Sequence, residues 1–143
     1  MNNNKIFFCV EYDKWTNFCY ENIVNEVCEA LSLSNKEISF LLTDDNKIQQ
    51  LNKQYRNKDY PTNVLSFESG DDVVLGDIVI SFDTLLRESI ENNKSFDDHF
   101  THLVIHGILH LLGYDHIIDS DAQIMEQIEI DTLKKLNIGN PYE

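Results

Sequence analysis

Hydrophobic and polar residues follow two different periods along this chain, and their alternation predicts strands interspersed with helices. Short runs rich in β-branched and aromatic side chains are typical of strands, whereas apolar residues that recur every three to four positions indicate helices. We expect strands at residues 5–12, 37–42, 63–67 and 75–81. We expect helices at residues 12–33, 43–56, 83–92, 96–112 and 119–136.

The order of these elements predicts the fold class. Residues 69–72 (SGDD) form a tight turn between the third and fourth strands, and the other strands are separated by helical segments. We therefore expect an α+β fold in which a mostly four-stranded mixed sheet is covered by about five helices. Because the chain contains no internal repeat and no Pro/Gly-rich linker, residues 1–143 are expected to form a single domain.

Particular side chains are expected to cap these helices or to face the core. Asp13 or Thr16 could cap the first helix, and the pattern from Ser95 to Asp98 predicts a cap for the fourth. The inward positions of two other helices follow from their apolar periodicity. They are Ile48, Leu51 and Tyr55 in the second helix, and Ile124, Ile128 and Leu133 or Leu136 in the last.

The fourth predicted helix is apolar on almost every side, which indicates that it is buried. His102, His106 and His110 lie on its one polar stripe. Buried polar groups without a partner cost about 1–3 kcal/mol each, so this stripe must be satisfied by other groups. Two histidines four residues apart stand side by side and can bind one ion. His102 lies about 12 Å along the axis from His110, which is too far for the two to share that ion.

The bend after this helix supplies a third ligand. Gly113 follows the last apolar turn, where helices often end with a residue at positive φ, so His116 can return over the stripe. We predict a metzincin-like metal helix with one Zn²⁺ per chain, bound by His106, His110 and His116. Neutral imidazoles favour zinc, although nickel, copper or iron can occupy similar sites. Three protein ligands leave a position for water, which is typical of catalytic sites and indicates a metal-dependent hydrolase.

The same His-x3-His-x5-His spacing occurs in the metzincin peptidases, whose motif is His-Glu-x-x-His-x-x-Gly-x-x-His. Gly107 stands where that motif has the glutamate that acts as general base, which argues against peptide hydrolysis by the metzincin mechanism. The nearest acid, Asp115, could orient a ligand histidine or could simply form the turn. The sequence leaves both roles open.

Charge narrows the function further. The net charge of −14 should repel a polyanion on average, which argues against a general nucleic-acid coat. Four cations, Lys47, Lys53, Arg56 and Lys58, nevertheless lie within twelve residues with no acid between them. This basic cluster could be a solvated helix face or could face an anionic substrate.

The cysteines and the apolar runs bear on the location of the protein. Cys9, Cys19 and Cys28 are odd in number and lack CxxC spacing, so we expect buried or half-buried reduced thiols. No apolar run approaches the ~20 residues needed to span a bilayer, and residues 1–15 lack the features of a signal peptide. We expect a cytoplasmic protein that does not bind membranes.

Three segments together resemble the YbeY family of bacterial rRNA-maturation endoribonucleases. HGILHLLGYDH (residues 106–116) resembles the family signature, LNKQYRNKDYPTNVLSF (51–67) resembles its other long motif, and LGDIVIS (75–81) resembles its third. The segments follow the family's order, although the family often has aspartate where this chain has Asn63.

The resemblance implies a function and a set of partners. It implies a three-histidine zinc site, single-strand-specific RNA cleavage, and roles in 16S rRNA 3′-end maturation and ribosome quality control. The implied partners are single-stranded rRNA and the small ribosomal subunit with its proteins, and a ribosome-associated GTPase is a further candidate. It also implies a role for Arg56, whose guanidinium can hold a phosphate by two hydrogen bonds.

Arg56 and His110 are therefore the candidate catalytic residues. Asn63 and Ser66 could line the same cleft or could simply belong to an ordinary edge strand. Two other functions stay open at this point. One is a non-catalytic ribosome-assembly factor that zinc stabilises, and the other is a metzincin-like peptidase.

Overall fold

In the computed structural model, which describes residues 3–143, four strands form one mixed sheet with the order β1-β2-β4-β3. Strands β1, β2 and β4 are parallel, and β3 is antiparallel to β4. The predicted α+β class is confirmed, while residues 1 and 2 of the predicted domain lie outside the described residues. The strands are β1 Lys5–Val10, β2 Glu37–Thr43, β3 Val64–Glu68 and β4 Val74–Ser81.

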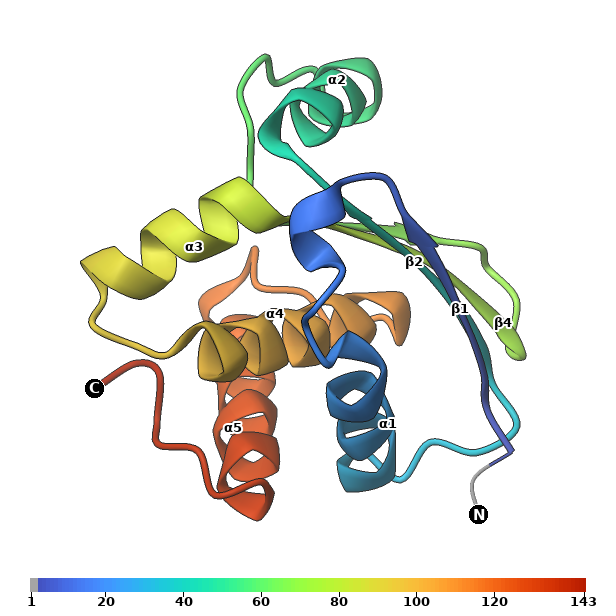
Figure 1. The fold of residues 1–143 in the computed structure, drawn as a ribbon. Helices are drawn as coiled ribbons and strands as arrows, with labels where there is room; N and C mark the ends of the chain where they lie inside the picture. Colours follow the sequence, from blue (N-terminus) through green and yellow to red (C-terminus); the bar gives the residue numbers. More distant parts are fainter. Residues whose placement is uncertain (1–2) are drawn as a thin grey trace.

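Five α-helices accompany the sheet in the described part of the chain, and a short 3-10 helix at Asp13–Trp15 precedes the first. Figure 1 shows α1, α4 and α5 on one side of the sheet and α2 on the opposite side. Over residues 3–143, no helix is long and apolar enough to cross a membrane. The helices are α1 Tyr20–Ala30, α2 Asp45–Arg56, α3 Phe82–Glu91, α4 Phe96–Leu111 and α5 Asp119–Lys135.

Helix α4 occupies the centre of the larger of two hydrophobic clusters. Phe100, Ile105 and Ile108 from this helix are fully buried together with Phe40 and Ile78 from the sheet. Full burial of such side chains contributes about 1.5–3 kcal/mol each, so this layer holds α4 firmly against the strands. The smaller cluster lies beneath α2 and consists of Ile48, Leu65 and Val79.

The termini of α4 agree with the sequence prediction. The Ser95 hydroxyl accepts a hydrogen bond of 3.1 Å from the backbone amide of Asp98, as the capping pattern predicted. Just after the other end, Gly113 has a φ of +99°, a backbone conformation that residues other than glycine rarely adopt. The chain therefore reverses directly after the helix.

The prediction of one continuous helix over residues 12–33 is wrong. Helix α1 begins only after Cys19 and has no side-chain cap, so neither Asp13 nor Thr16 caps it. A 3-10 turn and a loop take up the preceding residues.

Tertiary packing explains this difference. Trp15 is fully buried, and its indole nitrogen donates a hydrogen bond of 3.0 Å to the carbonyl of Thr43. Its ring packs against those of Phe82, Phe96 and Phe100, with centroids 5.2–6.1 Å apart. Burial of this large aromatic side chain outweighs the modest helical propensity of the segment.

One predicted inward position on α2 is also wrong. Ile48 is fully buried and Leu51 is partly buried, but Tyr55 is 56 % exposed. Asn52 is buried instead, and its side-chain amide donates a hydrogen bond of 2.9 Å to the carbonyl of Tyr60. Hydrogen bonding to a neighbouring loop makes burial of this polar residue tolerable.

The buried face of helix α5 also differs from the predicted one. Ile128 is partly buried and Leu133 is fully buried, as predicted, whereas Ile124 is 55 % exposed. Met125 and Glu129 occupy the inward positions in the second and third turns of the helix. The inward face of this helix therefore carries a carboxylate, which hydrophobic periodicity alone does not predict.

Of the three cysteines, which are free thiols, Cys28 is buried, but Cys9 and Cys19 are exposed, contrary to expectation. Alternation along the edge strand β1 explains Cys9. Ile6 and Phe8 pack against the larger core, so the intervening side chains point to the other face of the sheet.

Gly76 is required by a close approach of two strands. It lies beside a register irregularity between β2 and β4 and has a φ of +141°. A Cβ atom at this position would lie 2.1 Å from the carbonyl oxygen of Phe67. A larger residue would therefore force β3 and β4 apart.

We expect Gly76→Ala to lower the free energy of unfolding by about 2–4 kcal/mol, because it adds backbone strain and a steric clash. Urea denaturation would measure the loss. Gly139→Ala is the matched control, since no atom lies within 4 Å of its added Cβ, and its effect should stay within about 0.5 kcal/mol. Equal stability of the two variants would contradict this account of the strand contact.

Candidate metal centre

The bend after α4 brings three imidazoles together. His106 and His110 project from the last turns of α4, and His116 follows the reversal at Gly113. One nitrogen from each of the three rings lies within 4.8 Å of the other two. The convergence that the spacing predicted is therefore present in the structure.

The geometry of the three rings fits a single ion. The Nε2 atoms of His106 and His110 are 3.1 Å apart. The ring centroid of His116 lies 5.4 Å from the ring centroid of His106 and 5.0 Å from that of His110. Nitrogens that share an ion at about 2.1 Å are at most about 4.2 Å apart, so small side-chain rotations would suffice. His106 and His110 are partly buried and His116 is exposed. The three rings could thus hold a metal with one side open to solvent.

The surroundings of His110 favour its neutral form. Burial lowers the pKa of this imidazole, and the neighbouring rings of His106 and His116 lower it further. A neutral ring keeps the lone pair that a metal requires.

A buried carboxylate on α5, which the sequence pattern did not predict, pairs with histidines of the polar stripe of α4. The Glu129 side chain is 1 % exposed and accepts hydrogen bonds from His102, from His106 Nδ1 at 3.1 Å, and from the Tyr142 hydroxyl at 2.7 Å. Burial by itself would raise the pKa of Glu129, but these hydrogen bonds outweigh it and hold the pKa at about 2. The carboxylate is therefore ionised, and His102 binds it rather than the predicted ion site.

A weak signal for Glu129 exists in the sequence. It is spaced four residues from both Met125 and Leu133 on the buried face of α5. A charged residue at such a position is almost never fully buried unless it is paired. The partner could not be identified without the tertiary structure.

The three imidazoles line a pocket of about 450 Å³ together with Arg56 and with residues of β3. The Arg56 guanidinium donates a hydrogen bond of 2.8 Å to the carbonyl of Ser66 and lies 4.9 Å above the Phe67 ring. Asn63 and Ser66 line the pocket as expected. The pocket therefore combines three imidazoles that could hold a metal with a cation. Its carboxylates are Glu68 and Asp115.

The basic cluster does not face this pocket as a unit. Lys47 lines a separate groove beside α2, and Lys53 pairs with Asp59 at 3.7 Å on the surface. Among the four cations, Arg56 is the one that lines the pocket, within the described residues. The helical geometry of α2 separates Lys47, Lys53 and Arg56, because side chains at different positions of a helical turn point in different directions.

The structure explains the glycine that follows the first metal-site histidine. A Cβ atom on Gly107 would lie 3.1 Å from Ile78 and 3.3 Å from the hydroxyl of Ser66, which donates a hydrogen bond to the Gly107 carbonyl. A glutamate here would enter the contact between α4 and the sheet. Asp115 accepts a hydrogen bond of 2.7 Å from the amide of His116, which is the turn-forming role.

Comparisons with known proteins match this chain over most of its length. The family described as "Endoribonuclease YbeY" matches residues 3–137. A relative of that name from Ruthia magnifica is 50 % identical over 126 residues, which are 85 % of this chain and 87 % of the relative. Another from Francisella philomiragia is 46 % identical over 125 residues, which are 81 % of this chain and 79 % of the relative. The solution structure of TM1509 from Thermotoga maritima matches with a TM-score of 0.60 and 25 % identity, covering 94 % and 91 % of the two chains.

We expect the purified protein to bind about one divalent ion per chain, and His116→Ala to reduce this to nearly none because a ligand is lost. Elemental analysis after dialysis would measure the metal content. His116 is exposed, so the far-UV circular dichroism should not change. Asp115→Asn is the control and should keep the ion if Asp115 only shapes the turn; an ion retained by His116→Ala would contradict the assignment.

Proposed function

This chain belongs to the YbeY family, and from that membership we propose that it is a zinc-dependent, single-strand-specific endoribonuclease. Its proposed substrate is 16S rRNA at the 3′ end, with a further role in ribosome quality control. The observation that most supports this function is that Arg56 and the three imidazoles line one pocket. Its relatives carry the name endoribonuclease.

The donor set of the pocket suits the proposed zinc ion, because three neutral imidazoles match its preference for nitrogen ligands. His106, His110 and His116 would hold it. When bound, such an ion lowers the pKa of a water molecule towards ~7 and polarises a phosphoryl oxygen. The neutral ring of His110 contributes as a ligand, and this is its proposed catalytic role.

Arg56 is proposed to bind the phosphate of the substrate. Its guanidinium is held in place by the Ser66 carbonyl and by the Phe67 ring, so little conformational entropy is lost when it meets an anion. A guanidinium fixed in this way can neutralise the charge that develops on the phosphoryl oxygens during cleavage. It supplies a local positive charge in an otherwise acidic protein.

Aromatic rings beside Arg56 support the preference for single strands. Tyr55 is 56 % exposed, and its ring centroid lies 5.3 Å from that of Phe67. Exposed aromatic faces next to a cation favour stacking with unpaired bases, which duplexes do not offer. The small ribosomal subunit, its proteins and a ribosome-associated GTPase are the proposed partners, in the cytoplasm, and residues 1–143 are proposed to act as one hydrolase domain.

Two other functions are less well supported. A Cβ atom at Gly107 would already press on Ile78 and Ser66, so the tight contact with the sheet disfavours the metzincin base at this position and with it a peptidase. A docking factor that zinc merely stabilises would not need an arginine held beside the metal ligands in an open pocket. Cleavage experiments separate these alternatives.

We expect the protein to cleave a single-stranded fragment of the 16S rRNA 3′ region, and a chelator to abolish this cleavage until zinc is restored. A duplex of the same sequence serves as the control substrate and should be cut much more slowly. Far-UV circular dichroism should show that the chelated protein stays folded. Unfolding on chelation, or binding of the fragment without cleavage, would favour the docking factor.

Arg56→Ala should lower kcat/KM for the single-stranded fragment by about 10²–10³-fold, because a charge-stabilising group is removed. The metal content should stay near one ion per chain. Arg56→Lys keeps the charge without the planar fork of donors and should be intermediate. Loss of the metal from Arg56→Ala would show that this residue supports the structure instead.

A further inference from the structure

A hydrogen-bonded group lies behind the metal-site histidines, away from the pocket that they line. Glu129 from α5 is its centre, and His102, His106 and Tyr142 all donate to this carboxylate. We propose that Glu129 is a positioning residue that sets the tautomer and orientation of His106 for metal binding, and that Tyr142 holds Glu129 in place. The proposal rests on the metal site proposed above.

The two ring nitrogens of His106 face different partners. Nδ1 lies 3.1 Å from Glu129 Oε2, and Nε2 lies 3.1 Å from Nε2 of His110. A carboxylate accepts hydrogen bonds and cannot donate them when ionised, so the ring proton belongs on Nδ1. The lone pair of Nε2 is then directed at the point where the three imidazoles meet. Carboxylates behind metal-binding histidines fix the ring and raise its basicity in this way.

Burial makes the arrangement rigid. The Glu129 side chain is 1 % exposed, so water cannot replace a missing partner. Oε1 accepts from His102 and from the Tyr142 hydroxyl, and Oε2 accepts from His106. Because both oxygens are occupied, the carboxylate cannot turn without breaking a charge-assisted hydrogen bond. His102, which lies too far from His110 to share its ion, helps to fix this carboxylate.

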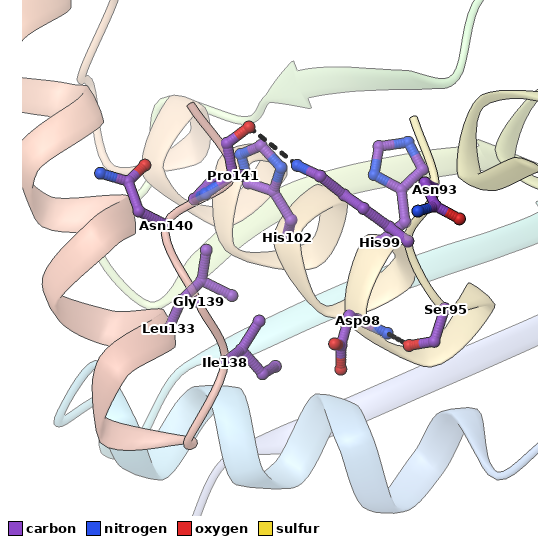
Figure 2. Close-up of a pocket in the computed structure, with 11 residues that line it drawn as sticks. Asn93, Ser95, Asp98, His99, His102, Leu133, Ile138, Gly139, Asn140 and Pro141 are labelled. Carbon is purple, nitrogen blue, oxygen red and sulfur yellow. Dashed lines mark hydrogen bonds between the residues drawn. The ribbon is translucent and has the colours of Figure 1, made fainter. Parts of the chain in front are cut away.

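The segment after α5 carries Tyr142 to this position. The carbonyl of Pro141 accepts a hydrogen bond of 2.8 Å from the Lys94 ammonium, drawn as a dashed line in Figure 2. Figure 2 also shows His102, on α4, which lines a pocket of about 240 Å³ together with Asn140 and Pro141. Pro141 is thus anchored to Lys94, just before α4, and Tyr142 is anchored to Glu129 on α5. The segment therefore brings the Tyr142 hydroxyl to Glu129.

The main test compares Glu129→Gln with Glu126→Gln. Glu126 is an exposed residue on the same helix, so the control removes an equal charge without touching His106. We expect Glu129→Gln to weaken zinc binding about 10–100-fold, measured by competition with a chelator, and Glu126→Gln to leave it unchanged. Equal affinities for Glu129→Gln and the unmodified protein would overturn the proposal.

The tautomer gives a readout that a purely structural role would not change. Imidazole ¹⁵N NMR of the metal-free protein should show the His106 proton on Nδ1, and Glu129→Gln should shift the ring to a mixture of tautomers. An unchanged tautomer in Glu129→Gln would also overturn the proposal. This measurement needs no metal. A protein that binds no zinc would therefore refute the proposed function, and the NMR measurement would still decide whether Glu129 sets the tautomer of His106.

Tyr142→Phe provides a milder variant in case Glu129→Gln does not fold. It removes one donor to Glu129 and leaves the ring in place, so zinc affinity should fall less than in Glu129→Gln but clearly below that of Tyr60→Phe. Tyr60 is 53 % exposed and serves as the matched control. Identical zinc affinities for the two tyrosine variants would show that the segment after α5 does not support the metal site.

Discussion

The burial of α4 between the sheet and the other helices is the constraint from which the functional site follows. A helix surrounded by apolar side chains has no water to solvate its histidines, so other protein groups must do so. His99 pairs with Glu88 from α3 at 2.8 Å, and His102 and His106 both bind Glu129 from α5. Towards the end of the helix, His106 and His110 line the pocket that also contains Arg56.

Close packing of α4 on the sheet determines what chemistry this pocket can hold. Gly107 lets the helix approach Ile78 and Ser66 closely, so β3 lies directly beside the imidazoles. That proximity brings Arg56 to the three imidazoles, because its guanidinium binds the Ser66 carbonyl. The same tight contact disfavours a glutamate at position 107. The glycine therefore separates this site from the metzincin arrangement for a steric reason.

Local sequence signals predicted the elements and their order well, and failed where a distant contact decided the outcome. Trp15 lies outside the α-helix predicted for it, because its side chain binds the carbonyl of Thr43 and packs among aromatic rings. Tyr55 and Ile124 have helical spacing but point to solvent. In each case, periodicity identified an apolar residue, and only the packing of neighbouring elements determined which face of the helix was buried.

The convergence of His106, His110 and His116 was determined by the sequence itself, because helical spacing and the glycine bend place all three within one short stretch of chain. The surroundings of these rings were decided only by the tertiary structure. Glu129 and Tyr142 come from other elements, and Arg56 comes from the opposite side of the sheet. No local rule relates residues so far apart, since their contacts arise from how helices and strands pack once the apolar side chains are buried.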